Sequence, residues 1–283
     1  MGPGAMSGDA RQAPTPITGW DCHNHLLGPY DRFPLAAERS YTPPEALVAD
    51  HSAMLAGQGL SHAVLVHPSA YGEDYSLLFH ALSTHDHLRG VIVARPGTPL
   101  DLATLRGRGV RALRYSHRSG AAGNFAGSAS IDDLRQMASA VADAGLHVEL
   151  WTDCEALPGI APLLASLPCP VVIDHMGSFD VRAGTEDPGF QQLLRLLADG
   201  KAWVKLSAYR SLLKTPDMEP GRPFHRKLLE ANPDQLVWGS DWPHIRIDPL
   251  PDTRKLFDTF RAWTGSESLV RRILVDNPTR LYG

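Results

Sequence analysis

The sequence predicts a closed (β/α)8 barrel of the TIM type, folded as a single domain. Three observations predict it: eight short apolar segments, helical patterns between them, and a length of 283 residues, which suits one such barrel. Several apolar segments are continuous rather than alternating, as expected of parallel strands covered on both faces. The expected strands are residues 17–22, 63–67, 90–94, 110–115, 146–151, 171–174, 202–206 and 235–239.

Helical patterns separate these strands, with apolar residues spaced three and four apart. Strands that alternate with helices imply βαβ units, right-handed crossovers and a parallel sheet. A doubly wound sheet is the alternative, but no G-x-G-x-x-G follows the first strand and no G-x-x-x-x-G-K-[ST] occurs anywhere. The expected helices are residues 46–56, 75–87, 132–144, 158–167, 189–199, 222–230 and 252–263.

The composition argues against several classes of protein. A net charge of −4 gives no basic footprint for nucleic acid, and no apolar run approaches the roughly 20 residues of a membrane span. Three cysteines without a C-x-x-C spacing argue against a disulfide framework. We expect a cytoplasmic monomer or small homo-oligomer that binds neither nucleic acid nor membranes. Residues 1–16 are expected to be a disordered tail before a barrel at residues 17–283.

Polar residues follow the expected strands at one rim, where barrel enzymes place their catalytic groups. His23 and His25 follow the first strand and, being two apart, point to the same face. His175 follows the sixth strand and Asp241 the eighth. Imidazole is the commonest neutral metal ligand and proton carrier near pH 7. We therefore expect these four side chains to form one metal-binding or catalytic site.

Each candidate also has a purely structural interpretation. The histidine pair could face solvent at a strand end, and Asp241 could cap a helix. His67 and His244 are as compatible with ordinary loops as with a site. Among the other polar residues, Glu149 and Asp153 are weaker candidates, Arg111 could pair on the outer side of the barrel, and Cys22 is expected in the core.

Three segments resemble the amidohydrolase superfamily, specifically its amidohydrolase 2 branch. They are DCHNH from Asp21, VVIDHMG around Asp174 and VWGSDWPH around Asp241. The ending ILVDNPTRLYG is similar to the C-terminal helix of that branch. The first loop, GPYDRFP followed by RSYTPP, is similar to that of 2-pyrone-4,6-dicarboxylate lactonases.

The resemblance implies a role for each matching residue. His23, His25 and His175 would bind one divalent metal such as Zn²⁺, with Asp241, or would polarise the scissile carbonyl in metal-free members. Asp241 would be the general base on water. The residues that fall where this group binds substrate are Tyr41, Ser69, Arg114, Arg210 and Trp151, with Arg118 as a looser match.

The chain departs from the family pattern at several positions. No lysine ends the fourth strand and no histidine ends the fifth, so a bridged two-metal site is not expected. Trp151 stands where a tyrosine would meet the substrate, and Ser178 replaces an arginine. These changes affect substrate contacts more than the type of reaction.

The resemblance implies hydrolysis of a carboxylated lactone, 2-pyrone-4,6-dicarboxylate or a related acid, in the catabolism of aromatic compounds. A metal-dependent decarboxylase of an aromatic or unsaturated acid is the alternative, and it would require tightly bound Zn²⁺. A catalytically inactive barrel used for binding would show broken motifs, whereas all four core residues are present.

Overall fold

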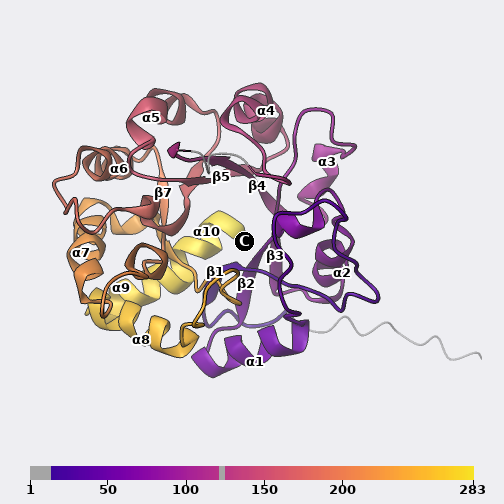
Figure 1. The fold of residues 1–283 in the computed structure, drawn as a ribbon, viewed down its shortest axis with the longest axis horizontal. Helices are drawn as coiled ribbons and strands as arrows, with labels where there is room; N and C mark the ends of the chain where they lie inside the picture. The colour runs from indigo at the N-terminus through magenta and orange to yellow at the C-terminus, as the bar shows by residue number, and fades with distance from the viewer. Residues whose placement is uncertain (1–13, 121–124) are drawn as a thin grey trace, which may run out of the picture.

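A computed structural model describes residues 14–120 and 125–283 and shows a barrel of eight parallel strands surrounded by helices (Figure 1). Each strand pairs with the next in the sequence, in the order β1 to β8. The predicted (β/α)8 fold is therefore confirmed. The strands are β1 (Trp20–Asn24), β2 (His62–Val66), β3 (Leu88–Ile92), β4 (Val110–His117), β5 (His147–Thr152), β6 (Val171–Ile173), β7 (Trp203–Leu206) and β8 (Leu236–Trp238).

The barrel closes where the chain following β8 meets β1. The backbone amide of Asp241 donates to the carbonyl of His23 at 2.8 Å, and the amide of His25 donates to the carbonyl of Trp242 at 2.9 Å. Gly239 permits this approach, because a Cβ there would lie 2.6 Å from the Cβ of His23. Closure thus places the end of β8 directly beside the two histidines of β1.

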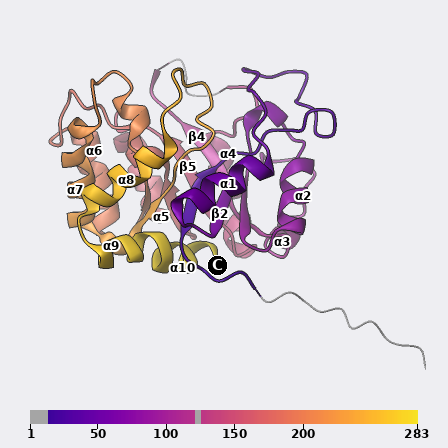
Figure 2. The same cartoon turned by 90° about the horizontal axis from the view of Figure 1, so that it is seen from below.

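Helices cover the outside of the barrel, and each of the seven predicted helices overlaps an observed one. Figure 2 shows α9 and α10 across one end, with the long loops at the other. The short helices α3 and α9 were not predicted. The helices are α1 (Val48–Gln58), α2 (Ser76–Thr84), α3 (Leu102–Leu105), α4 (Ile131–Asp143), α5 (Leu157–Ser166), α6 (Pro188–Ala198), α7 (Arg222–Ala231), α8 (Thr253–Thr264), α9 (Glu267–Arg271) and α10 (Asn277–Tyr282).

Tyr282 fills the bottom of the barrel. Its side chain is fully buried in the interior cluster, which also contains Trp20 and Cys22, as predicted for that cysteine. Its hydroxyl donates to Oε1 of Glu149 at 2.7 Å. Arg111 donates through Nε to the carbonyl oxygen of Tyr282 at 2.9 Å, so this arginine helps to hold the C-terminal helix against the barrel.

Some predictions concern parts of the chain or properties that the structure leaves untested. The expected disordered tail falls mainly on residues 1–13, outside the described residues, while Thr15 donates through Oγ1 to Asp86 at 3.0 Å. Among the described residues, no helix is both long and apolar enough to cross a membrane. The oligomeric state and the cytoplasmic location stay predictions.

Replacing Tyr282 by Ala should lower the free energy of unfolding by about 3–5 kcal/mol, because it empties a fully buried aromatic site. Urea unfolding at neutral pH measures this. Leu250→Ala is the control, since Leu250 is 66% exposed and its loss should cost about 0.5 kcal/mol or less. A similar loss in both variants would show that Tyr282 does not anchor the barrel.

Candidate active site

A cavity opens at the carboxyl ends of the strands, the rim that carries the active site in barrel enzymes. Side chains from both halves of the chain line it, including the four residues predicted to form the site. The polar and aromatic lining residues are His23, His25, Ser40, Tyr41, His67, Ser69, Arg114, Tyr115, Ser116, Phe125, Ser128, Trp151, His175, Arg210, Asp241 and Arg246.

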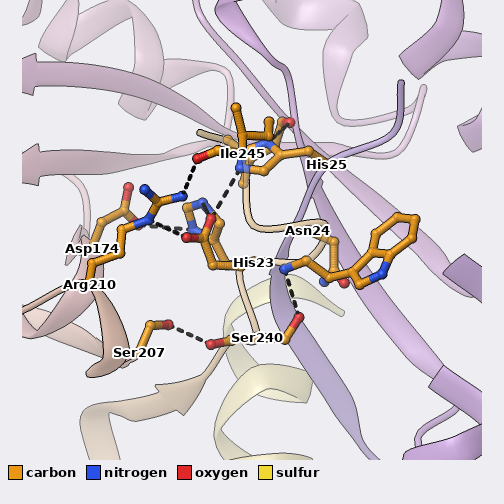
Figure 3. A network of polar contacts seen from close by, with 12 residues as sticks. His23, Asn24, His25, Asp174, Ser207, Arg210, Ser240 and Ile245 are labelled. Carbon is orange, nitrogen blue, oxygen red and sulfur yellow. Dashed lines mark hydrogen bonds and ion pairs between the residues drawn. The ribbon is translucent and has the colours of Figure 1, made fainter. Parts of the chain in front are cut away.

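The structure brings the four predicted core residues together. Oδ1 of Asp241 lies 3.6 Å from Nε2 of His23 and 3.4 Å from Nε2 of His25. The ring of His175 lies 4.8 Å from that of His23, measured between centroids. Figure 3 shows His23 and His25 with Arg210 around a common centre. A single water or substrate atom can therefore contact the carboxylate and an imidazole at once.

A left-handed backbone conformation orients the side chains of His175 and Asp241. His175, Met176 and Ser178 have φ of 50°, 53° and 42° in the turn after β6, and Asp241 has φ of 64° after β8. Side chains at such left-handed positions cost about 1–2 kcal/mol per residue, and these positions cluster at functional sites. The hydrogen bond from the Asp241 amide to His23 holds one of these two turns in place.

Asp241 is held as a carboxylate by its neighbours. The Tyr209 hydroxyl donates to its Oδ2 at 2.6 Å, and Nε of Arg210 donates to the same oxygen. Burial alone would raise the pKa of Asp241, but the Arg210 guanidinium and the His175 ring outweigh burial and hold it well below its usual value. These side-chain partners, rather than helix amides, bind the carboxylate, so the helix-cap interpretation is wrong.

A second charged cluster lies below the first, inside the barrel. Nζ of the fully buried Lys205 lies 2.5 Å from Oε2 of Glu149, 3.1 Å from Oδ1 of Asp174 and 3.2 Å from Nδ1 of His23. Nε of Arg114 donates to Oδ2 of Asp174 at 2.8 Å. Burial would lower the pKa of Lys205, but Asp174 and Glu149 raise it above its usual value. Lys205, Asp174 and Glu149 are therefore all charged.

The predicted substrate-binding residues divide into two groups. Tyr41, Ser69, Trp151 and the two arginines Arg114 and Arg210 line the cavity, although each arginine is paired with a carboxylate there. Arg118 does not line it. Its guanidinium lies 4.6 Å from the centre of the Trp151 ring, and its Nε is 3.5 Å from the Asp153 carboxylate. Arg118 thus contacts Trp151, a residue that lines the cavity, without lining the cavity itself.

The structure also distinguishes two histidines that the sequence left open, His67 and His244. His67 lines the cavity, with Nε2 2.8 Å from the carbonyl of Gly72. His244 does not; it is buried with Nε2 2.7 Å from the hydroxyl of Thr253.

Arg246 is a cavity residue that the sequence interpretation missed. It lies in the loop after β8, with φ of 63°, and its guanidinium is 6.0 Å from the centre of the Tyr41 ring. It has no carboxylate partner within 4 Å among the residues described. Its position two residues after the DWPH segment was the available signal, but loop residues carry no periodicity that gives their direction.

The donor types and spacing fit a divalent metal. His23, His25 and Asp241 offer ligand atoms within 4.8 Å of one another, as do His23, Asp174 and His175. Nε2 of His23 and Nδ1 of His175 are buried and have no hydrogen-bond partner among the described residues. Imidazole nitrogen and carboxylate oxygen are ordinary zinc ligands.

Asp21 supports the site from behind. Its Oδ1 accepts from the Ser240 amide at 2.8 Å and from the His23 amide at 3.3 Å, which ties the end of β8 to β1. The side chain is fully buried, and burial raises its pKa to about 7 despite these hydrogen bonds.

The chain matches the model of the amidohydrolase family over residues 20–283, and it therefore belongs to that family. The resemblance noted in the sequence is confirmed. It is 33% identical to a 4-sulfomuconolactone hydrolase of Rhizobium radiobacter, over 97% of this chain and 94% of that protein. It is 32% identical to a 2-pyrone-4,6-dicarboxylate hydrolase of Comamonas testosteroni, over 94% and 90% respectively.

The solved structures agree with this assignment. A candidate 2-pyrone-4,6-dicarboxylic acid hydrolase from Pseudomonas putida is 32% identical and superposes with a TM-score of 0.79, covering 94% of this chain and 98% of that one. The similarity thus extends over nearly the whole barrel.

The raised pKa of Asp21 predicts a pH-dependent stability. Between about pH 4 and 7 the folded protein keeps a proton on Asp21, whereas the unfolded chain releases it. This carboxyl therefore stabilises the fold at low pH. The stabilisation is lost as the pH rises through about 7. The free energy of unfolding of Asp21→Asn, taken relative to that of the native protein, should therefore increase by about 2–3 kcal/mol when the pH rises from 5 to 8. Urea unfolding at the two pH values measures it, and an unchanged difference would contradict a protonated Asp21.

Proposed function

We propose that the protein hydrolyses a carboxylated lactone by attack of water on the ring carbonyl. The observation that carries this proposal is the buried, ionised Asp241 between two imidazoles, at the base of a cavity that also contains arginines. The family and the named hydrolases of two acidic lactones support it.

The reaction follows from the groups around Asp241. Its carboxylate accepts a proton from water, and the water oxygen bonds to the lactone carbonyl carbon. Buried hydrogen-bond donors among the imidazoles stabilise the resulting oxyanion. The bond between that carbon and the ring oxygen then breaks, and the ring oxygen receives a proton from Asp241 or solvent. The products are a carboxylate and an enol or alcohol.

The cavity lining suits a ring with acidic substituents. Phe125 and Trp151 pack edge to face, with 5.6 Å between centroids, and form an apolar wall for the ring. Arg246 and the hydroxyls of Tyr41 and Ser69 can bind an acidic substituent, because guanidinium groups bind carboxylates and sulfonates through two hydrogen bonds. Arg210 can also bind an acidic substituent if its guanidinium leaves Asp241 and pairs with the substrate instead.

A divalent metal held by His23, His25 and Asp241, or by the second set that includes His175, would add polarisation of the lactone carbonyl. The chain's own residues supply the base, the imidazoles and the cationic wall in either case. Metal analysis of the purified protein establishes the occupancy.

Asp241→Asn should lower kcat by at least about 1,000-fold while KM changes little, because the amide cannot accept the proton of water. Steady-state hydrolysis of 2-pyrone-4,6-dicarboxylate and of a muconolactone measures this, and Asp258→Asn on the exposed face of α8 is the control. Turnover near the native rate in Asp241→Asn would exclude this residue as the base. Release of CO₂ by the native protein, without ring opening, would instead indicate the decarboxylase alternative.

Arg246→Gln should raise KM for a lactone with two acidic groups by about 5- to 10-fold and leave kcat nearly unchanged. The reason is the loss of one half-solvated charge pair, worth about 1 kcal/mol. Arg222→Gln is the matched control, since Arg222 lies on α7 and does not line the cavity. Equal KM values for all three proteins would remove Arg246 from substrate binding.

A further inference from the structure

Lys205 is a buried cation that does not itself line the cavity, yet it contacts His23, which does. We propose that Lys205 is a positioning residue that keeps the proton of the His23 ring on Nε2, so that His23 presents a hydrogen-bond donor to the reacting carbonyl. The effect on turnover rests on the proposed lactone hydrolysis, whereas the position of the proton on His23 does not.

The hydrogen bonds of Lys205 decide where that proton lies. An ammonium group has three donors and no acceptor. Nζ makes two hydrogen-bonding contacts, to Oε2 of Glu149 at 2.5 Å and to Nδ1 of His23 at 3.2 Å. Oδ1 of Asp174 forms an ion pair with it at 3.1 Å. A proton on Nδ1 would point at the ammonium group. Nδ1 must therefore accept, and the single proton of the neutral ring lies on Nε2.

Asp174 favours the opposite arrangement. Its Oδ1 lies 3.5 Å from Nδ1 of His23 and would accept a proton from that nitrogen. This separation is longer than an ordinary hydrogen bond, whereas the Lys205 contact is within range. A proton on Nδ1 would also face the ammonium group of Lys205 at 3.2 Å, which disfavours it. Lys205 is thus the group that selects one tautomer over the other.

His25 shows the contrast within the same motif. Its Nδ1 lies 2.8 Å from the carbonyl oxygen of Val66, which can only accept, so Nδ1 carries the proton. In the neutral ring Nε2 of His25 is then a lone pair. The two histidines consequently present different groups to Asp241, and only His23 can donate to an oxyanion. A metal bound through Nε2 of His23 would require the opposite tautomer.

The test must separate this role from a structural one. Lys205→Met alone leaves two buried carboxylates without their shared cation and can fail to fold. The double variant Lys205→Met with Glu149→Gln removes one charge of each sign and leaves Asp174 paired with Arg114 at 2.8 Å. Glu149→Gln alone is the matched control, because it keeps Lys205 beside His23.

The tautomer is read directly by ¹⁵N NMR of histidine-labelled protein, with the His23 signals identified by their loss in His23→Gln. We expect a protonated Nε2 and an unprotonated Nδ1 in the native protein and in Glu149→Gln. In the double variant the proton should move to Nδ1, which faces Asp174. Turnover should then fall about 10- to 100-fold below that of Glu149→Gln, with KM changed less than twofold.

Two results would overturn the proposal. One is a proton on Nδ1 of His23 in the native protein, a measurement that needs no variant of Lys205. The other is a double variant that keeps the native tautomer and the turnover of the control. If the tautomer shifts as expected but the native protein opens no lactone, the proposed function fails while the assignment of Lys205 stands.

Discussion

The junction between β8 and β1 is the constraint on which the site depends. Two backbone hydrogen bonds, from the amides of Asp241 and His25, close the barrel there. Only glycine fits at position 239, where a Cβ would overlap His23. Because closure joins the two ends of the sheet, residues more than 200 positions apart in the chain share one centre. Tyr282 of the C-terminal helix packs into the interior cluster with Trp20 and Cys22.

Charges in the barrel are arranged in two layers. Asp241 and Arg210 form the upper layer at the cavity, and Lys205 with its two carboxylates forms the lower one. Buried charges cost several kcal/mol each unless they are paired and hydrogen bonded. Pairing leaves few alternative arrangements, so the layers fix the orientation of His23, which lies between them. The reacting groups are therefore oriented before a substrate binds.

The sequence predicted the fold and the core of the site because both depend on local patterns. Continuous apolar segments indicated parallel strands, and the two-residue spacing of His23 and His25 placed both imidazoles at one rim. The left-handed turn at His175 could not be predicted, since tertiary packing stabilises it against local preference. The pairing of Lys205 with Glu149 depends on the register between strands, and the directions of Arg118 and Arg246 depend on loop packing.

The central claim is that water attacks the carbonyl carbon of a lactone at Asp241, between His23 and His25. Hydrolysis of a carboxylated lactone by the native protein in H₂¹⁸O, followed by mass spectrometry of the product, tests it most directly. The substrate is one whose ring oxygen leaves as an alcohol, because an enol becomes a ketone that exchanges its oxygen with water. After a single turnover, one ¹⁸O should appear in the newly formed carboxylate and none in the alcohol oxygen. Label in the hydroxyl oxygen would place the attack on the ring carbon instead, and a product without ¹⁸O would exclude hydrolysis.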